Sequence, residues 1–81
     1  MPPRFLPAGE SALVVEFAAG IDPEAERQVL ALDAALAATP IDGVRETVPT
    51  YRSLMLHFDP RRLTFAALVA AIEPYAEGRG R

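Results

Sequence analysis

The chain contains no cysteine and no lysine, and it has a single histidine, His57, among its 81 residues. Without cysteine it has no disulfide framework, no thiolate metal site and no cysteine nucleophile. Without lysine it has no amine for Schiff-base chemistry and no P-loop lysine. One histidine excludes a catalytic triad or a two-histidine metal site made by this chain alone. We interpret His57 as an outward-facing strand residue rather than a general base.

The sequence also lacks a long hydrophobic run and a concentrated basic region. No apolar run approaches the roughly 20 residues that span a bilayer, and the N-terminus has no signal-peptide pattern. Net charge is −3, and the arginines are scattered apart from Arg61–Arg62 and the two in the tail. Nucleic-acid binding needs a basic face. We therefore expect a cytoplasmic protein that binds neither nucleic acid nor membrane.

The length and composition predict one small globular domain. Hydrophobic residues make up 51% and charged residues 23%, which is typical of a folded chain rather than a disordered one. A chain of this size buries roughly 60% of its unfolded surface, so the core is thin. We expect the domain to occupy residues 1–76 and residues 77–81 to form a flexible tail.

The first half of the sequence predicts two strands and a helix. Residues 4–7 are flanked by prolines and suit an edge strand, and Gly9 can take positive φ in the following turn. Residues 11–17 alternate as a strand, whose core-facing residues should be Leu13, Val15 and Phe17. Val14 on the other face indicates that this face is partly covered or contacts another chain or domain. Asp22–Pro23 predicts a helix start, with an end before Pro40.

The second half predicts a hairpin and a second helix. Val44 and Val48 frame the first hairpin strand, with Glu46 on the same face, and Pro49–Thr50 supplies the bend. Inward residues of the next strand should be Leu54, Leu56 and Phe58, leaving Ser53, Met55 and His57 on the other face. Thr64 caps a helix that Pro74 should limit.

The predicted order is (β)βαββα, which favours an α+β fold: a small ferredoxin-like open sandwich with two helices on one face of an antiparallel sheet. A complete ferredoxin-like unit ends in one further strand, and this sequence has none. We therefore predict an unpaired sheet edge and self-association through that edge.

The strongest candidate site is the hairpin bend at Tyr51, Arg52 and Ser53. An arginine there can pair bidentately with a carboxylate or phosphate, oriented by the other two side chains. Alternatively, Tyr51 packs over the sheet while Arg52 and Ser53 satisfy turn carbonyls. We favour contact with a partner domain or subunit over direct catalysis.

Gly9, Glu10 and Ser11 form a second candidate, either a small polar site beside that bend or a turn that serves the backbone. The acidic residues of segment 22–26 are interpreted as helix-capping rather than metal-binding groups. A carboxylate pair of Glu46 with Asp59 or Glu16 stays open, because spacing in the sequence cannot establish it. We assign no catalytic residue and no metal ligand.

Two segments resemble one known family. Residues 6–17 read LPAGESALVVEF, similar to the pattern P-x-G-D-x-A-L-x-V-x-F, and residues 48–60 contain VPTYRSL followed by FDP, similar to P-x-Y-R-S-L-x-V-x-(Y/F)-D-P. These patterns belong to the KipI / 5-oxoprolinase B-type family, also called allophanate hydrolase subunit 1 or carboxyltransferase domain, subdomains C and D. The resemblance extends from Arg4 to about Ile72. The chain departs from the pattern at Glu10, where the family has Asp.

The resemblance implies that this chain is the N-terminal α/β domain of a longer protein whose cyclophilin-like C-terminal domain is absent from it. It implies a subunit of an ATP-dependent amidohydrolase complex that opens 5-oxoproline to glutamate. The partners would be companion subunits and the missing domain. We expect this domain to bind no cofactor, since ATP belongs to the full complex, and to be inactive in isolation.

An alternative function follows from the same resemblance. The resemblance to KipI implies a protein inhibitor that binds a sensor histidine kinase. The alanine- and arginine-rich, lysine-free composition indicates a GC-rich genome, which disfavours a low-GC spore-former of the KipI type.

Overall fold

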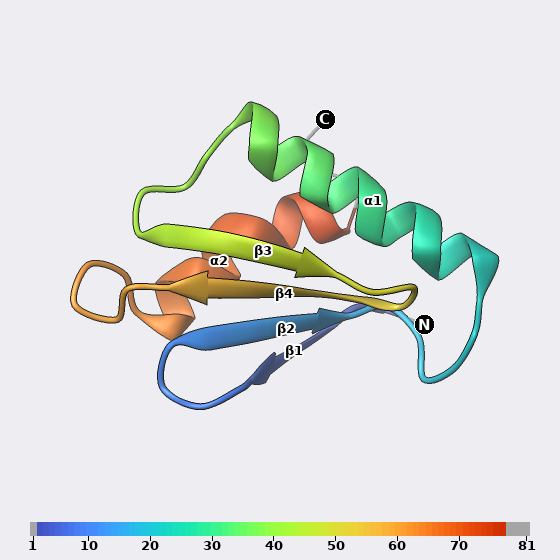
Figure 1. Cartoon of the computed structure of the whole chain (residues 1–81), viewed down its shortest axis with the longest axis horizontal. Coiled ribbons are helices and arrows are strands. Elements are labelled where there is room, and N and C mark those ends of the chain that lie inside the picture. The colour runs from blue at the N-terminus through green and yellow to red at the C-terminus, as the bar shows by residue number, and fades with distance from the viewer. Residues whose placement is uncertain (1, 78–81) are drawn as a thin grey trace.

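The computed structural model describes residues 2–77 as one four-stranded antiparallel sheet with both helices on the same face (Figure 1). The elements in chain order are β1 (Arg4–Pro7), β2 (Ala12–Glu16), α1 (Pro23–Ala38), β3 (Val44–Pro49), β4 (Ser53–Phe58) and α2 (Phe65–Ala76). The strand order is β1-β2-β4-β3. The predicted α+β open sandwich is therefore confirmed. The predicted tail at 77–81 lies, apart from Glu77, outside the described residues.

The N-terminal strand β1 occupies the place beside β2 where a ferredoxin-like unit has its closing strand. It reaches this place by folding back on β2 as an antiparallel hairpin. The predicted edge left by a missing strand is therefore wrong, because β2 is paired on both sides. The edges of the sheet are β1 and β3, which carry Pro7 and Pro49, and proline discourages pairing with another strand. Self-association through an edge stays a prediction.

The core lies between the sheet and the two helices. Its sheet side is the inner face, where the alternating residues of β2 and β4 are nearly inaccessible to solvent, as predicted. The helices contribute one buried stripe each, because apolar residues recur every three or four positions. Buried core residues of these four elements are Leu13, Val15, Leu54, Leu56, Phe58, Ala25, Val29, Leu32, Leu36, Leu68, Ile72 and Ala76.

Strand β3 contains a β-bulge at Arg45. Val44 pairs with the last residue of β4, whereas Glu46 pairs with His57, so two steps on β3 match one step on β4. The extra residue turns Glu46 and Val48 to the outer face of the sheet and leaves Val44 on the core side. The prediction that these three β3 residues share one face is therefore wrong.

The proline positions also differ from the prediction. Pro49 is the last residue of β3, opposite Leu54, rather than a corner of the turn. Pro74 lies inside α2, in its final turn, and does not end the helix. The helix continues because the turn around Pro74 is closed by the N–H of Glu77, which donates to the carbonyl of Glu73 at 3.0 Å, and because Ala76 is buried in the core.

The predicted helix starts are confirmed. The side chain of Asp22 accepts a hydrogen bond from the N–H of Glu24 at 3.0 Å, and Pro23 follows at the first helical position. The hydroxyl of Thr64 accepts from the N–H of Ala67 at 3.1 Å at the start of α2. Within residues 2–77, neither helix has the length and apolar character needed to cross a membrane.

Candidate functional site

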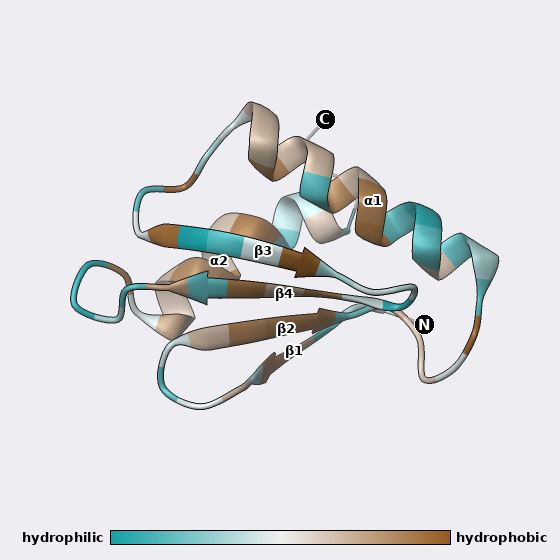
Figure 2. Ribbon diagram, viewed as in Figure 1, coloured by the Kyte–Doolittle hydropathy of each residue, from teal (hydrophilic) through white to brown (hydrophobic). Residues whose placement is uncertain are grey.

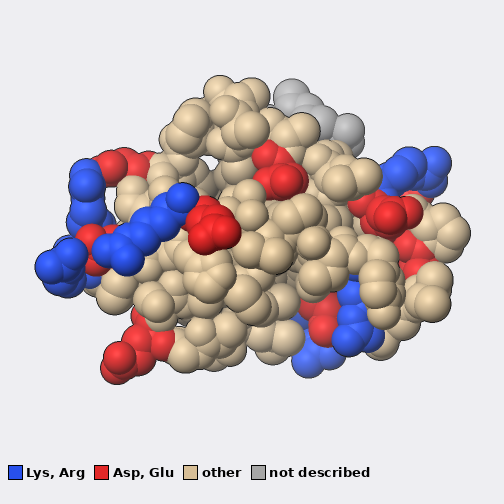
Figure 3. Space-filling view, viewed as in Figure 1, with Lys and Arg blue, Asp and Glu red and all other residues tan. Residues whose placement is uncertain are grey.

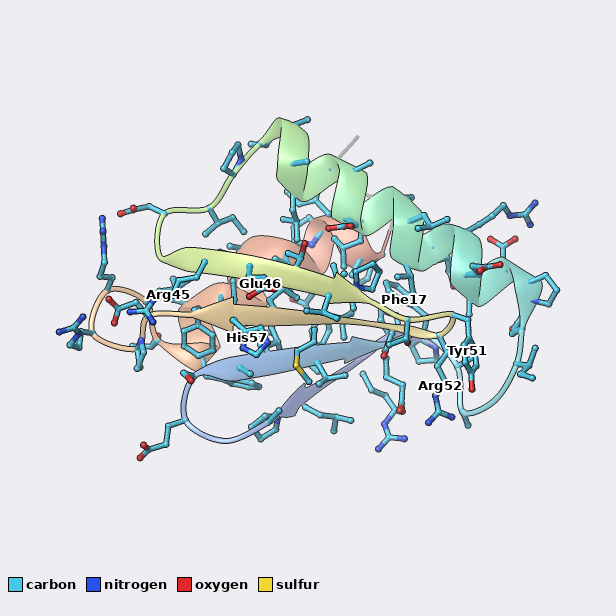
Figure 4. The ribbon with its side chains drawn as sticks, in the orientation of Figure 1. Phe17, Arg45, Glu46, Tyr51, Arg52 and His57 are labelled. Carbon is cyan, nitrogen blue, oxygen red and sulfur yellow. The ribbon has the colours of Figure 1, made fainter. Side chains whose placement is uncertain are left out.

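The β3–β4 turn is held in one conformation by Thr50. The backbone N–H of Thr50 donates to the carbonyl of Ser53 at 2.8 Å, and its hydroxyl accepts from the N–H groups of Ser53 and Arg52 at 3.0 and 3.3 Å. The two hydroxyls of Thr50 and Ser53 lie 2.9 Å apart, within hydrogen-bond distance. Because these bonds close a tight loop, Tyr51 and Arg52 are presented at the end of the sheet (Figure 4).

Arg52 ties this turn to the loop between β2 and α1. Its guanidinium donates to the carbonyl of Ala19, and its own carbonyl accepts from the N–H of Phe17 at 2.9 Å. Arg52 thus satisfies a backbone carbonyl, but one in the β2–α1 loop rather than in the turn itself. Tyr51 makes no hydrogen bond among the described residues and is 53% exposed. Ile21, on the tied loop, is 87% exposed, so two apolar side chains project from two connected loops.

Ser53 lies beside an ion pair on the outer face. It is opposite Glu16 of β2, which in turn is opposite Arg4 of β1. The guanidinium of Arg4 lies 3.2 Å from the Glu16 carboxylate. The outer face is therefore polar at the end near the β3–β4 turn, and the charges of Arg4 and Glu16 there are paired with each other.

Gly9 and Glu10 lie at the opposite end of the sheet. They precede β2, whose first residue, Ala12, is opposite His57 near the end of β4. The β3–β4 turn leads into Ser53, at the start of β4. The prediction that they sit beside the bend is wrong, because antiparallel pairing places the start of β2 beside the end of β4, at the end of the sheet away from the turn. Gly9 has φ +75°, which serves the β1–β2 turn.

The possible pair of Glu46 with Glu16 is not brought together. Glu16 and Glu46 are opposite Ser53 and His57, four residues apart along β4, which corresponds to about 13 Å. Asp59 is instead bound by arginines. Among residues 2–77 there is no group of three or more histidine, cysteine, aspartate or glutamate residues that could hold a metal ion.

The Asp59 cluster is a feature that sequence reasoning missed. One carboxylate oxygen accepts from the backbone N–H and Nε of Arg61 at 3.0 and 3.1 Å. The other accepts from Nη2 of Arg61 at 3.2 Å and lies 3.4 Å from Nη2 of Arg45. These bonds to Arg61, with a smaller contribution from Arg45, lower the pKa of Asp59 to about 2. The sequence signal for this cluster was the run of Asp, Pro and two Arg after β4. The contact of Asp59 with Arg45 at the β3 bulge joins residues that are distant in sequence, so this run alone does not predict it.

An apolar row crosses the outer face of the sheet on all four strands. Leu6 of β1 is opposite Val14 of β2, which is opposite Met55 of β4, which is opposite Val48 of β3. We call these four residues the outer row. Val48 is 40% exposed and the other three are half-buried. The strands are apolar along this row (Figure 2), and charged residues lie mainly around the margins of the same view (Figure 3).

The fold and these surfaces define a small α+β domain that presents an apolar sheet face and a turn held by hydrogen bonds. The chain belongs to the family described as carboxyltransferase domain, subdomain C and D, whose model matches residues 3–80. This confirms the family indicated by the two sequence motifs.

Solved structures of larger proteins share this fold. The chain is similar to the conserved uncharacterized protein PH0987 from Pyrococcus horikoshii, with a TM-score of 0.83 and 25% identity over 94% of this chain. It is also similar to TTHA0988, with a TM-score of 0.70 and 37% identity over 76% of this chain. The chain spans 35% of the length of PH0987 and 13% of the length of TTHA0988. No curated protein matches it.

Proposed function

We propose that this carboxyltransferase C/D subdomain is the N-terminal domain of a subunit of an ATP-dependent 5-oxoprolinase, also called allophanate hydrolase subunit 1. In this proposal it contacts other parts of the enzyme and does not carry out the reaction itself. The family match over residues 3–80 is the observation that carries the proposal. The ring opening of 5-oxoproline, and the ATP that drives it, belong to the complete assembly.

The side-chain chemistry of the chain supports a non-catalytic role. The sequence supplies one histidine and neither cysteine nor lysine as a nucleophile. The arginine at the bend donates to the carbonyl of Ala19, and the buried carboxylate, Asp59, is bound by two arginines. A general base must be able to take a proton near neutral pH, and a carboxyl with a pKa of about 2 is a poor one.

The surface of the domain supports a docking role. The outer row forms a continuous apolar band on the sheet face that neither helix covers. Tyr51 and Ile21 project at one end of the molecule from loops that the Arg52 hydrogen bond connects. Exposed aromatic side chains on a rigid support are typical anchors of protein interfaces. We propose that the outer row and Tyr51 contact a companion subunit or a linked domain.

Co-purification with the products of neighbouring genes, followed by a 5-oxoproline-dependent ATPase assay, tests this function. The expected result is turnover by the assembled proteins and none by the 81-residue chain alone. Turnover by the chain alone would contradict the division of roles. Capture of a sensor histidine kinase together with inhibition of its autophosphorylation, without 5-oxoproline-dependent ATPase activity, would instead establish the KipI-type alternative.

A further inference from the structure

Among residues 2–77, three arginines gather at the end of the sheet where β4 finishes: Arg45 at the β3 bulge, and Arg61 and Arg62 in the loop that leads to α2. We call these three residues the arginine corner. Basic side chains are visible at this end of the molecule in the space-filling view (Figure 3). The corner follows β4, whereas Tyr51 precedes it, so the two surfaces lie at opposite ends of that strand.

The backbone beneath the arginine corner is fixed by contacts between two loops. The N–H of Asp59 donates to the carbonyl of Gly43 at 2.8 Å. The carbonyl of Asp59 in turn accepts from the N–H groups of Arg62 and Leu63, both at 3.0 Å. Gly43 has φ +103°, and a Cβ added there would lie 3.0 Å from the Cβ of Leu63, so this close approach requires glycine. A fixed backbone lowers the entropy cost of binding a partner.

One carboxylate positions two of the guanidiniums. The side chain of Asp59 is 11% exposed, whereas those of Arg45 and Arg61 are 62% and 82% exposed. The oxygen that accepts from Nη2 of Arg61 at 3.2 Å also lies 3.4 Å from Nη2 of Arg45. Because the pKa of Asp59 is about 2, this carboxylate is charged at neutral pH. The negative group is therefore shielded beneath the surface, and the two positive groups that it positions are exposed.

The guanidiniums of the corner keep N–H donors that the chain does not use. A guanidinium carries more donors than one carboxylate can accept. Within residues 2–77, Arg61 bonds Asp59 through Nε and Nη2, and the guanidinium of Arg45 makes an ion pair but no hydrogen bond. Arg62 bonds Asp42 through Nη2. Since Arg45 and Arg61 meet at one oxygen of Asp59, an added carboxylate can bridge their remaining donors.

From this arrangement we propose that the arginine corner binds an acidic segment of a partner protein, whose carboxylates bridge the guanidiniums of Arg45 and Arg61. The arginines are largely exposed, so a single small anion is held weakly there, whereas an acidic segment presents several carboxylates together. Nucleic acid fits less well, because it needs a larger basic face and the chain has a net charge of −3. This surface is additional to the outer row and Tyr51 and does not depend on the proposed function.

NMR titration of the ¹⁵N-labelled 81-residue chain tests this surface with three probes. These are a tetraglutamate peptide blocked at both ends, the matching tetraglutamine peptide, and inorganic phosphate. Tetraglutamate should give saturable shifts of the backbone amides of residues 45 and 59–62 and of the Nε–H signal of Arg61. We expect a Kd on the order of 1 mM at low salt. Tetraglutamine should not saturate, and phosphate should bind roughly fivefold or more weakly than tetraglutamate.

Three variants assign the interaction to the arginine corner. Arg45→Gln leaves the hydrogen bonds between Arg61 and Asp59 in place and should weaken tetraglutamate binding roughly two- to fivefold. Arg61→Gln should have an effect of similar size. Arg27→Gln is the matched control, because it removes an equal charge from an exposed ion pair with Glu24 on α1 and should leave the affinity unchanged.

Four results would overturn the proposal. The first is unchanged tetraglutamate affinity in both corner variants, and the second is an equal loss in Arg27→Gln. The third is phosphate, or an oligothymidylate of similar charge, that binds as tightly as tetraglutamate, which would indicate a small anion or a nucleic acid as the ligand. The fourth is no saturation by about 50 mM tetraglutamate. Thermal unfolding shows whether each variant is folded, and Arg45→Gln provides the test if Arg61→Gln is not.

Discussion

The two faces of the sheet carry similar apolar side chains but differ in what covers them. On β4, Leu54 and Leu56 are fully buried beneath the helices, whereas Met55 between them points to the outer face and is half-buried. The inner face is an ordinary core. The outer row is also apolar and continuous across four strands, yet neither helix packs on it. The comparison shows that the same alternating pattern can place a core on one side of the sheet and an apolar face that neither helix covers on the other.

The largest expected effect is a difference in stability between substitutions on the two faces of the sheet. Leu56→Ala should lower the free energy of unfolding by about 2–5 kcal/mol, because it leaves a cavity in a fully buried site. Met55→Ala, its neighbour on the outer face, should cost about 1 kcal/mol or less in the isolated chain. Urea unfolding followed by circular dichroism measures both. Equal losses would mean that the outer face is already part of the core.

Partner binding should reverse this ranking. Tyr51→Ala should leave stability within about 0.5 kcal/mol of the parent, because Tyr51 is exposed and makes no hydrogen bond within residues 2–77, but should weaken partner binding by about 2 kcal/mol. Leu30→Ala is the matched control, since Leu30 is equally exposed on α1, away from the turn. Isothermal titration with the co-purifying partner measures the difference. Similar losses for both variants would argue against the turn as the contact.

A smaller effect tests how rigidly the turn is held. Thr50→Val removes the hydroxyl that accepts from the N–H groups of Arg52 and Ser53. It should cost about 1 kcal/mol of stability, the usual contribution of such a side-chain bond. It should also raise amide hydrogen exchange at residues 51–53. Unchanged exchange there would show that the strands alone fix the turn.

The smallest effect concerns acid stability and is given as a direction. The pKa of Asp59 in the folded chain is about 2, below its ordinary value of 3.8, so the folded state binds its proton less readily than the unfolded state. Asp59 therefore stabilises the fold fully above about pH 4, and this contribution is lost as pH falls from 4 toward 2. Asp59→Asn should flatten the fall in stability over that window. Parallel urea titrations at several pH values measure it, and identical slopes would contradict this.

Local rules in the sequence predicted most of the elements. The cap at Asp22, the cap at Thr64 and the alternation of β2 and β4 each depend on a few neighbouring residues, and each is confirmed. The bulge at Arg45 was visible only as a broken alternation in β3, which a sequence alone does not distinguish from a misplaced polar residue. The place of β1 beside β2 depends on strand order, which is set by tertiary packing rather than local pattern.

The candidate site was predicted only in part, because the sequence shows which residues are neighbours along the chain but not how the strands pair. Residues 51–53 are contiguous, and the structure places them together at one turn. Gly9 and Glu10 were placed beside the bend as one of two alternatives, and the antiparallel pairing of β2 with β4 separates them from it. The contact between Asp59 and Arg45 joins residues that are distant in sequence, so no spacing rule could reveal it.

The methyl group of Met55 gives the most direct test that the outer face is a docking surface. Met55 lies in the middle of the outer row, and the sequence contains one other methionine, at position 1. Methyl-¹³C methionine labelling therefore gives two signals that are readily distinguished. On addition of the co-purifying partner, we predict that the Met55 signal shifts or broadens in step with binding. Complex formation with an unchanged Met55 signal would contradict the proposal that the outer row is the contact surface.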